Sequence, residues 1–300
     1  MRMHGVYTAR MQTPLHGPLA TPASEALDGP IELFYRLAAS GAVPRRLFAP
    51  ALPRLAAYAP AGGRTSIEIV SHCWRYATLL SYQLSSLVLD PPRDVSVTMT
   101  VFYAEEDEDT RRALAFFGAQ AVPNVRWNWW ALPKHQLFRR SIGRNLAAVN
   151  STADWVHFTD CDVLFRDGAL DALDRAVRGS TVPLVFPREH KVTPLLASDD
   201  PMFTIAPETV VELPVREWLP DVRDRATGPL QITRGDAARA LGYCGTTPFF
   251  QRPADRWRKA REDRVFRWLM GTPGTAIELD GIYRIRHQAK GRKGAELAVG

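Results

Sequence analysis

The chain has few cysteines and no long run of apolar residues. Its three cysteines, Cys73, Cys161 and Cys244, lie far apart and form no C-x-x-C element. This argues against a structural zinc site and for a reducing compartment. No apolar stretch reaches the roughly 20 residues that a membrane-spanning helix needs. Residues 1–24 also lack the apolar core of a secretory signal. Together these absences favour a cytoplasmic protein.

Lysine is scarce, and the positive charge comes almost wholly from arginine. The 300 residues include 33 Arg and five Lys against 32 acidic residues, which gives a net charge of +6. A basic surface favours anionic partners, such as nucleotide sugars or phospholipid head groups, so peripheral contact with a membrane stays open. The sequence has no Lys/Arg block of the length typical of nucleic-acid binding, and nucleic acid is not expected as a partner.

Residues 1–64 differ in character from the rest of the chain. Residues 1–30 contain several Pro and Gly without sustained periodicity, and we expect them to be loosely ordered. Two short helices are expected within this region, at 31–40 and 53–59. We interpret residues 1–64 as a partly disordered N-terminal extension and residues 65–300 as the main domain.

From residue 66 onward, strand-like and helix-like patterns alternate. Strands are expected at 66–70, 95–103, 125–132 and 155–160, with helices at 74–89, 110–119 and 140–151 between them. The second half is less regular, with strands near 182–187, 276–280 and 282–287 and helices at 234–242 and 254–270. This alternation predicts an α/β fold with a mixed, mainly parallel sheet flanked by helices.

The apolar strand that begins at residue 155 leads into two carboxylates, Asp160 and Asp162. Alternate residues of a strand leave the same face, roughly 7 Å apart. The carboxyl end of a strand is also where open α/β sheets bind their ligands. Two oxygens so placed suit Mg²⁺ or Mn²⁺. A D-x-D triplet also occurs by chance, with one Asp capping a turn and the other solvated, but the buried strand before it favours the metal site.

Four features in a fixed order resemble the GT-A-fold glycosyltransferases, most closely those of family 2. They are the strand at 66–70, G-R-N at 143–145, D-C-D at 160–162, and Glu262-Asp263 followed by His287. The resemblance covers about residues 66–290. It implies a Rossmann-like GT-A domain that moves a sugar, of the hexosyl type, from a nucleoside-diphosphate donor to an acceptor hydroxyl with inversion.

The resemblance also implies roles for individual residues. Asp160 and Asp162 would hold Mn²⁺ or Mg²⁺ on the donor diphosphate, and His287 would complete the metal shell. Asp263 would be the general base, with Glu262 as its neighbour and substitute. The macrodipole alone also favours carboxylates in the first turn of a helix, so a simple capping role is the alternative for this pair.

Ser71, Glu105, Arg144 and Asn145 are further donor-binding candidates, together with Asp160. Ser71 follows the first strand, where S-H-C-W-R-Y replaces the common P-T-[YF]-N of the family. Glu105 lies in A-E-E-D-E-D, where the family usually has D-D-G-S. Arg144 suits bidentate contact with a phosphate, or it braces an aspartate of the D-x-D loop.

Two other functions remain open. A sugar-1-phosphate nucleotidyltransferase uses a related sheet and metal, but it normally has a glycine-rich loop after the first strand, and S-H-C-W-R-Y has no glycine. A catalytically degenerate GT-A domain that only binds a nucleotide or sugar would account for the unusual first loop. The D-x-D triplet, the Glu-Asp pair and the late His oppose this second alternative.

Overall fold

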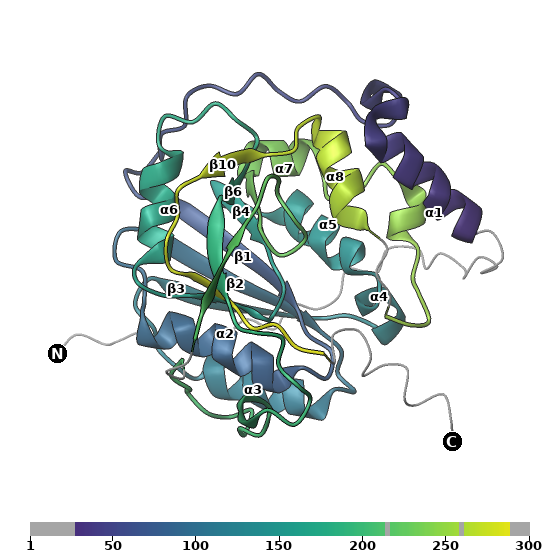
Figure 1. Cartoon of the computed structure of the whole chain (residues 1–300). Helices are drawn as coiled ribbons and strands as arrows, with labels where there is room; N and C mark the ends of the chain where they lie inside the picture. Colours follow the sequence, from purple (N-terminus) through teal and green to yellow (C-terminus); the bar gives the residue numbers. More distant parts are fainter. Residues whose placement is uncertain (1–27, 214–216, 258–260, 289–300) are drawn as a thin grey trace.

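The computed structural model describes residues 28–213, 217–257 and 261–288. Its strands form a seven-stranded sheet with the order β10-β6-β9-β4-β1-β2-β3 and a four-stranded sheet with the order β5-β11-β7-β8 (Figure 1). The strands are β1 Ser66–His72, β2 Ser96–Tyr103, β3 Val125–Ala131, β4 Trp155–Phe158, β5 Val163–Phe165, β6 Leu184–Pro187, β7 Glu189–Val192, β8 Leu219–Val222, β9 Gln231–Arg234, β10 Thr275–Ile277 and β11 Ile282–Arg284.

The helices connect and cover these strands. They are α1 Asp28–Leu37, α2 Ala77–Leu89, α3 Glu108–Gly118, α4 Lys134–Leu137, α5 Arg140–Asn150, α6 Ala169–Val177, α7 Gly235–Leu241 and α8 Glu262–Met270. Shorter turns are the π-helical η2 Ala38–Ala42 and the 3₁₀ segments η3 Arg45–Leu47, η4 Pro201–Phe203 and η5 Pro248–Gln251. Within the described ranges, none of the helices is long and apolar enough to cross a bilayer.

The large sheet is parallel from β3 through β2 and β1 to β4. β9 then runs antiparallel to both β4 and β6, while β10 is parallel to β6. The predicted α/β class, with a mixed and mainly parallel sheet flanked by helices, is confirmed. The reversed strand β9 and the separate four-stranded sheet were not expected from the sequence.

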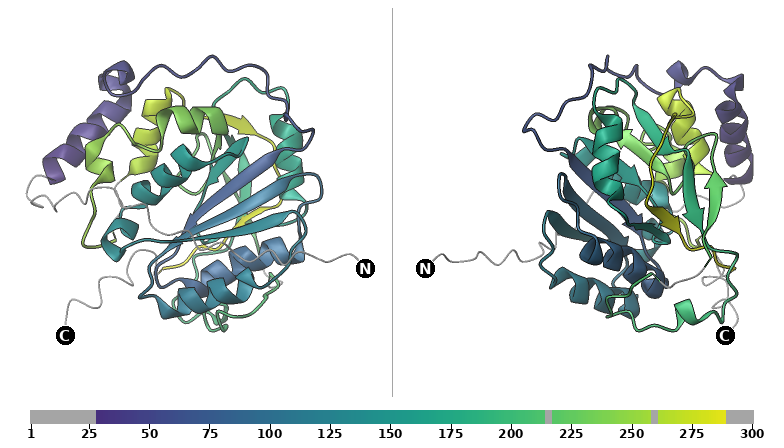
Figure 2. Two further views of the ribbon diagram at one scale, coloured as in Figure 1. Left: turned by 180° about the vertical axis from the view of Figure 1, so that it is seen from behind. Right: turned by 60° about the vertical axis from the view of Figure 1, so that its left-hand side comes forward.

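Helices cover both faces of the large sheet, and each face has its own hydrophobic core (Figure 2). On β4, Trp155 points into the core shared with α2 and α3, whereas Val156 and Phe158 point into the core shared with α5, α7 and α8. All four residues of β4 are buried. Burial on both faces explains why this strand reads as continuously apolar rather than alternating.

The segment before β1 packs on the main domain. α1 lies beside α8 (Figure 1). On η5, Tyr35 of α1 packs against the rings of Phe249 and Phe250, at 6.2 and 5.5 Å between centroids. The predicted helix at 53–59 is wrong. This stretch is extended, because the Tyr58 backbone exchanges hydrogen bonds with Gly179 and Ser180. The prediction of loose order at 1–30 falls almost entirely outside the described residues.

We expect acid to destabilise the fold through His157. This side chain is buried inside β4 with Nε2 3.2 Å from the carbonyl of Pro229, and burial lowers its pKa to about 4. The unfolded imidazole binds a proton near pH 6.5, so the stabilisation is complete above that pH and is lost as pH falls towards 4. Between pH 7.5 and 5, this group should lower the free energy of unfolding by about 2 kcal/mol.

Urea unfolding of the wild type and of His157→Gln at the two pH values checks this prediction. The variant should lose less stability than the wild type between pH 7.5 and 5, whatever its absolute stability. Replacement of the exposed His135 by Gln is the matched control and should keep the wild-type difference. Equal pH dependence in wild type and His157→Gln would show that His157 does not carry the effect.

Candidate functional site

The two aspartates of the D-x-D triplet line a small cavity at the carboxyl end of β4. Its volume is about 40 Å³, and its walls come from five separate parts of the chain. The lining residues are His72, Tyr76, Leu79, Arg140, Asp160, Cys161, Asp162, Trp257 and His287. Asp160, Asp162 and His287, which were predicted to share a metal, therefore border the same space.

Asp160 is held by two arginines of α5. Its Oδ1 accepts hydrogen bonds from Arg140 Nη1 at 3.0 Å and from Arg144 Nη2 at 3.2 Å. Arg144 is completely buried, and it also donates to the carbonyl of Thr159 and to the hydroxyl of Tyr243. The geometry of Arg144 matches the second of its two predicted roles, the brace for an aspartate of the D-x-D loop.

Arg140 connects the D-x-D loop to the start of α8. Its second terminal nitrogen, Nη2, lies 2.9 Å from Oε1 of Glu262, so one guanidinium bridges Asp160 and Glu262. Burial opposes the positive charge of Arg140, but Glu262 and Asp160 outweigh this effect and raise its pKa above the ordinary value. Two acidic motifs that are far apart in the sequence are thereby joined at one site.

Asp162 is buried and faces the second sheet. Its Oδ2 lies 3.3 Å from Nε of Arg284 on β11, and its backbone carbonyl accepts from the amide of Ile285. Asp162 raises the pKa of Arg284. His287, three residues beyond Arg284, is also buried, and its ring packs against Tyr76 at 5.3 Å between centroids.

The donor chemistry of Asp160, Asp162 and His287 fits a divalent cation, because two carboxylates and one imidazole border one cavity. In this structure, however, arginines contact both carboxylates. Across the residues that the structure describes, no three or more His, Cys, Asp or Glu side chains are grouped closely enough to hold a metal. A cation would therefore compete with arginine for these oxygens.

Glu262 and Asp263 open α8 but differ in their surroundings. The Glu262 side chain is 5% exposed, and its Oε2 has no hydrogen-bond partner within the described ranges. The Asp263 side chain is 27% exposed, and its Oδ2 contacts Arg267 at 3.2 Å. Asp263 is thus the more accessible carboxylate of the pair.

A buried polar chain runs behind the cavity from α5 to α8. The hydroxyl of Tyr243 accepts from Arg144 and donates to Oε1 of Gln231 at 2.7 Å. Gln231 Nε2 in turn donates to the backbone carbonyl of Asp263 at 3.3 Å. Burial raises the pKa of Tyr243, so its hydroxyl stays protonated and keeps its donor role. This chain fixes the start of α8 relative to the D-x-D loop.

The other predicted donor-binding residues do not line the cavity. Ser71 is buried within β1. Glu105 accepts a hydrogen bond from the hydroxyl of Tyr103 at 3.0 Å. Asn145 accepts from the backbone amide of Tyr243 at 2.9 Å, which holds the turn after α7. Their roles in donor binding stay predictions.

Sequence reasoning missed His72, Arg140, Trp257 and Arg284, which all border the site. His72 stacks on Phe102 with 5.0 Å between ring centroids. Burial, followed by the nearby Arg144 and Arg140, lowers the His72 pKa well below its usual range. The spacing of Arg140 and Arg144 was an available signal, because residues four apart lie on the same side of a helix.

The close packing of His72 depends on Gly143 of α5. A Cβ added at Gly143 would lie 2.3 Å from Nε2 of His72 and 2.9 Å from Cγ of Phe102. The G-R-N triplet therefore contributes in two ways. Its glycine admits the imidazole, and its arginine holds Asp160.

A larger groove of about 800 Å³ opens on the other side of Asp162 and His287. Its lining includes Arg284 of β11, Arg286 just after β11, and Arg223 just after β8. Asp162 and His287 border both spaces, so the groove adjoins the D-x-D cavity.

No family model and no curated protein matches the chain. Among solved structures, it is similar to the mannosyltransferase PcManGT from Pyrobaculum calidifontis in complex with GDP-Man and Mn²⁺, with 16% identity, a TM-score of 0.45, and coverage of 87% of this chain and 66% of that one. It is also similar to S. aureus TarS 1-349 with UDP, with 12% identity, a TM-score of 0.47, and coverage of 73% and 60%. The chain spans only about 60–66% of the length of these structures.

Proposed function

We propose that this protein is a glycosyltransferase that moves a sugar, of the hexosyl type, from a nucleoside-diphosphate donor to an acceptor hydroxyl with inversion. The observation that carries the proposal is the double ion pair of Arg140 with Asp160 and Glu262. It brings a D-x-D triplet at a strand's carboxyl end next to an acidic pair at a helix start. Metal-assisted departure of a diphosphate and deprotonation of an acceptor require these two groups at one site.

The donor diphosphate would bind at the end of β4. Asp160 and Asp162 would hold Mn²⁺ or Mg²⁺, with His287 at the edge of the same cavity. When bound, such an ion neutralises charge on the departing diphosphate. Arg140 and Arg284 are positioned to turn from the carboxylates to phosphate oxygens, for which a guanidinium is well suited.

Asp263 is the better candidate for the general base. Glu262 is buried and its carboxylate is paired with Arg140, so it is less accessible to an acceptor hydroxyl. Asp263 is partly exposed in the first turn of α8. The acceptor hydroxyl would give its proton to a carboxylate oxygen of Asp263. At the same time, the hydroxyl oxygen would attack the anomeric carbon on the side opposite the diphosphate, and the diphosphate would leave. This displacement inverts the anomeric centre.

Donor binding with and without Mn²⁺ tests this function. Nucleotide sugars, including GDP-mannose and UDP-GlcNAc, would be screened by thermal unfolding, and hydrolysis of each donor would then be measured. At a donor concentration of 100 times the dissociation constant, the stabilisation should be about 2.7 kcal/mol. We expect one donor class to stabilise the protein in the presence of Mn²⁺ and to be hydrolysed slowly.

A binding-only module is the second candidate, and the arginines on both aspartates favour it. It predicts donor binding that is independent of Mn²⁺ and no hydrolysis or transfer. Formation of a nucleotide sugar from a nucleoside triphosphate and a sugar 1-phosphate would instead indicate a nucleotidyltransferase. Failure of every donor to bind would refute the proposal.

A further inference from the structure

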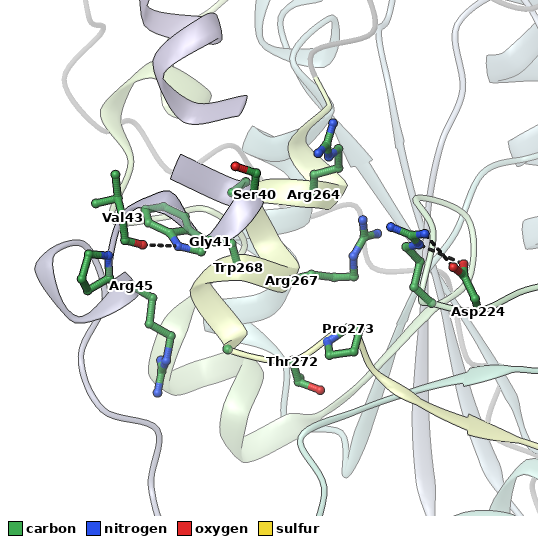
Figure 3. A pocket seen from close by; sticks show the side chains of 14 residues that line it. Ser40, Gly41, Val43, Arg45, Asp224, Arg264, Arg267, Trp268, Thr272 and Pro273 are labelled. Atoms are coloured by element: carbon green, nitrogen blue, oxygen red, sulfur yellow. Dashed lines mark hydrogen bonds and ion pairs between the residues drawn. The ribbon is translucent and has the colours of Figure 1, made fainter. Parts of the chain in front are cut away.

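A second large pocket lies between the segment that follows α1 and the outer side of α8 (Figure 3). Its volume is about 740 Å³. Its lining consists of Ala39, Ser40, Gly41, Val43, Pro44, Arg45, Asp224, Arg225, Arg264, Arg267, Trp268, Gly271, Thr272 and Pro273. Neither aspartate of the D-x-D triplet borders it, so it is separate from the D-x-D cavity, although Arg267 in its lining pairs with Asp263.

The charge of this pocket is strongly positive. Four of its lining residues are arginines that approach from η3, from α8 and from the loop before β9, whereas Asp224 is the one acid in the described lining (Figure 3). Asp224 is already paired with the neighbouring Arg225, and Arg267 is paired with Asp263 of the same helix. Arg264 makes no ion pair with any residue that the structure describes. Such a pocket attracts an anionic group.

An exposed apolar surface adjoins the pocket. Leu33, Phe34 and Leu37 of α1 and Leu47 of η3 are between 44% and 68% exposed. The opposite side of α1 is already buried on the protein, where Tyr35 meets η5. α1 is therefore apolar on two sides, and the outward side has no cover among the described residues. Clustered exposed apolar residues of this kind mark an interaction surface.

Ring contacts connect the apolar surface to the pocket wall. Phe34 lies 5.9 Å from Phe48, and Phe48 lies 5.3 Å from Trp268, between ring centroids. Trp268 is fixed by a hydrogen bond of 2.9 Å from its Nε1 to the carbonyl of Val43, drawn in Figure 3. Phe34, Phe48 and Trp268 thus connect the exposed side of α1 to the wall of the pocket.

More arginines surround the leucines. Arg36 and Arg46 are exposed and form no ion pair with any described side chain, while the sequence of α1 also includes two acids, Asp28 and Glu32. Apolar side chains bordered by arginines suit the interface of a bilayer, where the former enter the acyl boundary and the latter meet anionic head groups.

We propose that α1, η3 and the outer side of α8 form a docking surface for a bilayer that contains anionic phospholipid. The leucines enter the interface, and a head-group phosphate binds in the arginine pocket. Charge complementarity selects this occupant over a second copy of the chain, because two copies would bring their arginines together. The pocket shares Arg267 with Asp263, the proposed base, but vesicle binding requires no sugar transfer, so the inference can be tested independently of the enzyme activity.

Co-sedimentation with vesicles tests the proposal. The full chain would be mixed with phosphatidylcholine vesicles or with vesicles that contain about 30% phosphatidylglycerol. We expect at least ten-fold tighter binding to the anionic vesicles, weakened by raising NaCl from 0.1 to 0.5 M. The double variant Arg46→Gln/Arg264→Gln should bind them about 25-fold more weakly, at roughly five-fold per arginine. Leu37→Ser/Leu47→Ser should also bind more weakly.

Matched controls are Arg126→Gln on the sheet edge and Val149→Ser on α5, which are exposed away from this surface and should bind as the wild type does. Thermal unfolding of each variant confirms that it is folded.

Equal binding to both vesicle types, or variants that bind as the wild type does, would overturn the proposal. Stabilisation by free phosphate without vesicle binding would assign the pocket to a soluble anion. Dimers that Leu37→Ser/Leu47→Ser dissociates, without vesicle binding, would assign the surface to a second copy. Either result also overturns the proposal.

Discussion

Replacement of Asp162 by Asn is expected to lower the rate of sugar transfer by about 10³-fold, at the upper end of the loss seen when one preorganised electrostatic group is removed. Asn has the same shape and keeps one oxygen for Arg284, which lies 3.3 Å away. It removes the negative charge that would hold a divalent cation on the departing diphosphate. Metal-dependent donor binding should be lost together with turnover.

Steady-state transfer and donor titration with and without Mn²⁺ measure both effects. Asp162 is buried, so the free energy of unfolding of the variant should also fall by about 1–3 kcal/mol. The assays are therefore run well below the unfolding temperature of the variant. Asp167→Asn is the matched control, because Asp167 accepts a hydrogen bond from Tyr283 and lies outside the cavity. Full turnover by Asp162→Asn would refute the metal assignment.

Asp263→Asn is expected to reduce turnover by about 10²–10⁴-fold with little change in donor affinity. A base that acts on the acceptor stabilises the transition state and contributes nothing to the bound donor. Because Asp263 is partly exposed and its partner Arg267 also donates to the carbonyl of Ala226, the substitution should do little structural harm.

Glu262→Gln is the informative comparison for this prediction. In this variant, Asp160 is the one remaining acidic partner of Arg140 among the described residues, so Glu262→Gln should lose more stability than Asp263→Asn does. Its turnover per folded molecule should fall less than that of Asp263→Asn. The opposite ranking of turnover would make Glu262 the base. If both variants keep the wild-type rate, the pair only caps α8.

The local patterns of the sequence were sufficient to predict the parallel half of the sheet. β1, β2, β3 and β4 are short apolar runs separated by helices, and burial on both faces gives such runs a clear signal. The position of Asp160 and Asp162 at a strand's end followed from the same pattern. β9 was missed as an antiparallel strand because nothing local fixes strand direction, which depends on its pairing with β4 and β6.

Partners of charged residues were the harder part of the site. Arg140 and Arg284 are two of 33 arginines, and which of them meets an aspartate depends on how α5 and β11 pack around the end of β4. The prediction of a helix at 53–59 was wrong for a related reason. Its composition favours a helix, but tertiary hydrogen bonds to the turn after α6 take its backbone groups instead.

Because Arg140 forms ion pairs with both Asp160 and Glu262, we expect the divalent cation and the diphosphate donor to bind cooperatively. A divalent cation that approaches Asp160 repels the guanidinium, by about 4 kcal/mol per unit charge at 4 Å in a partly screened site. A metal arriving alone must displace Arg140 and leave it without that partner. If a diphosphate arrives with the metal, it offers Arg140 new oxygens, so metal and donor should each bind weakly alone and tightly together, by the same factor in either order.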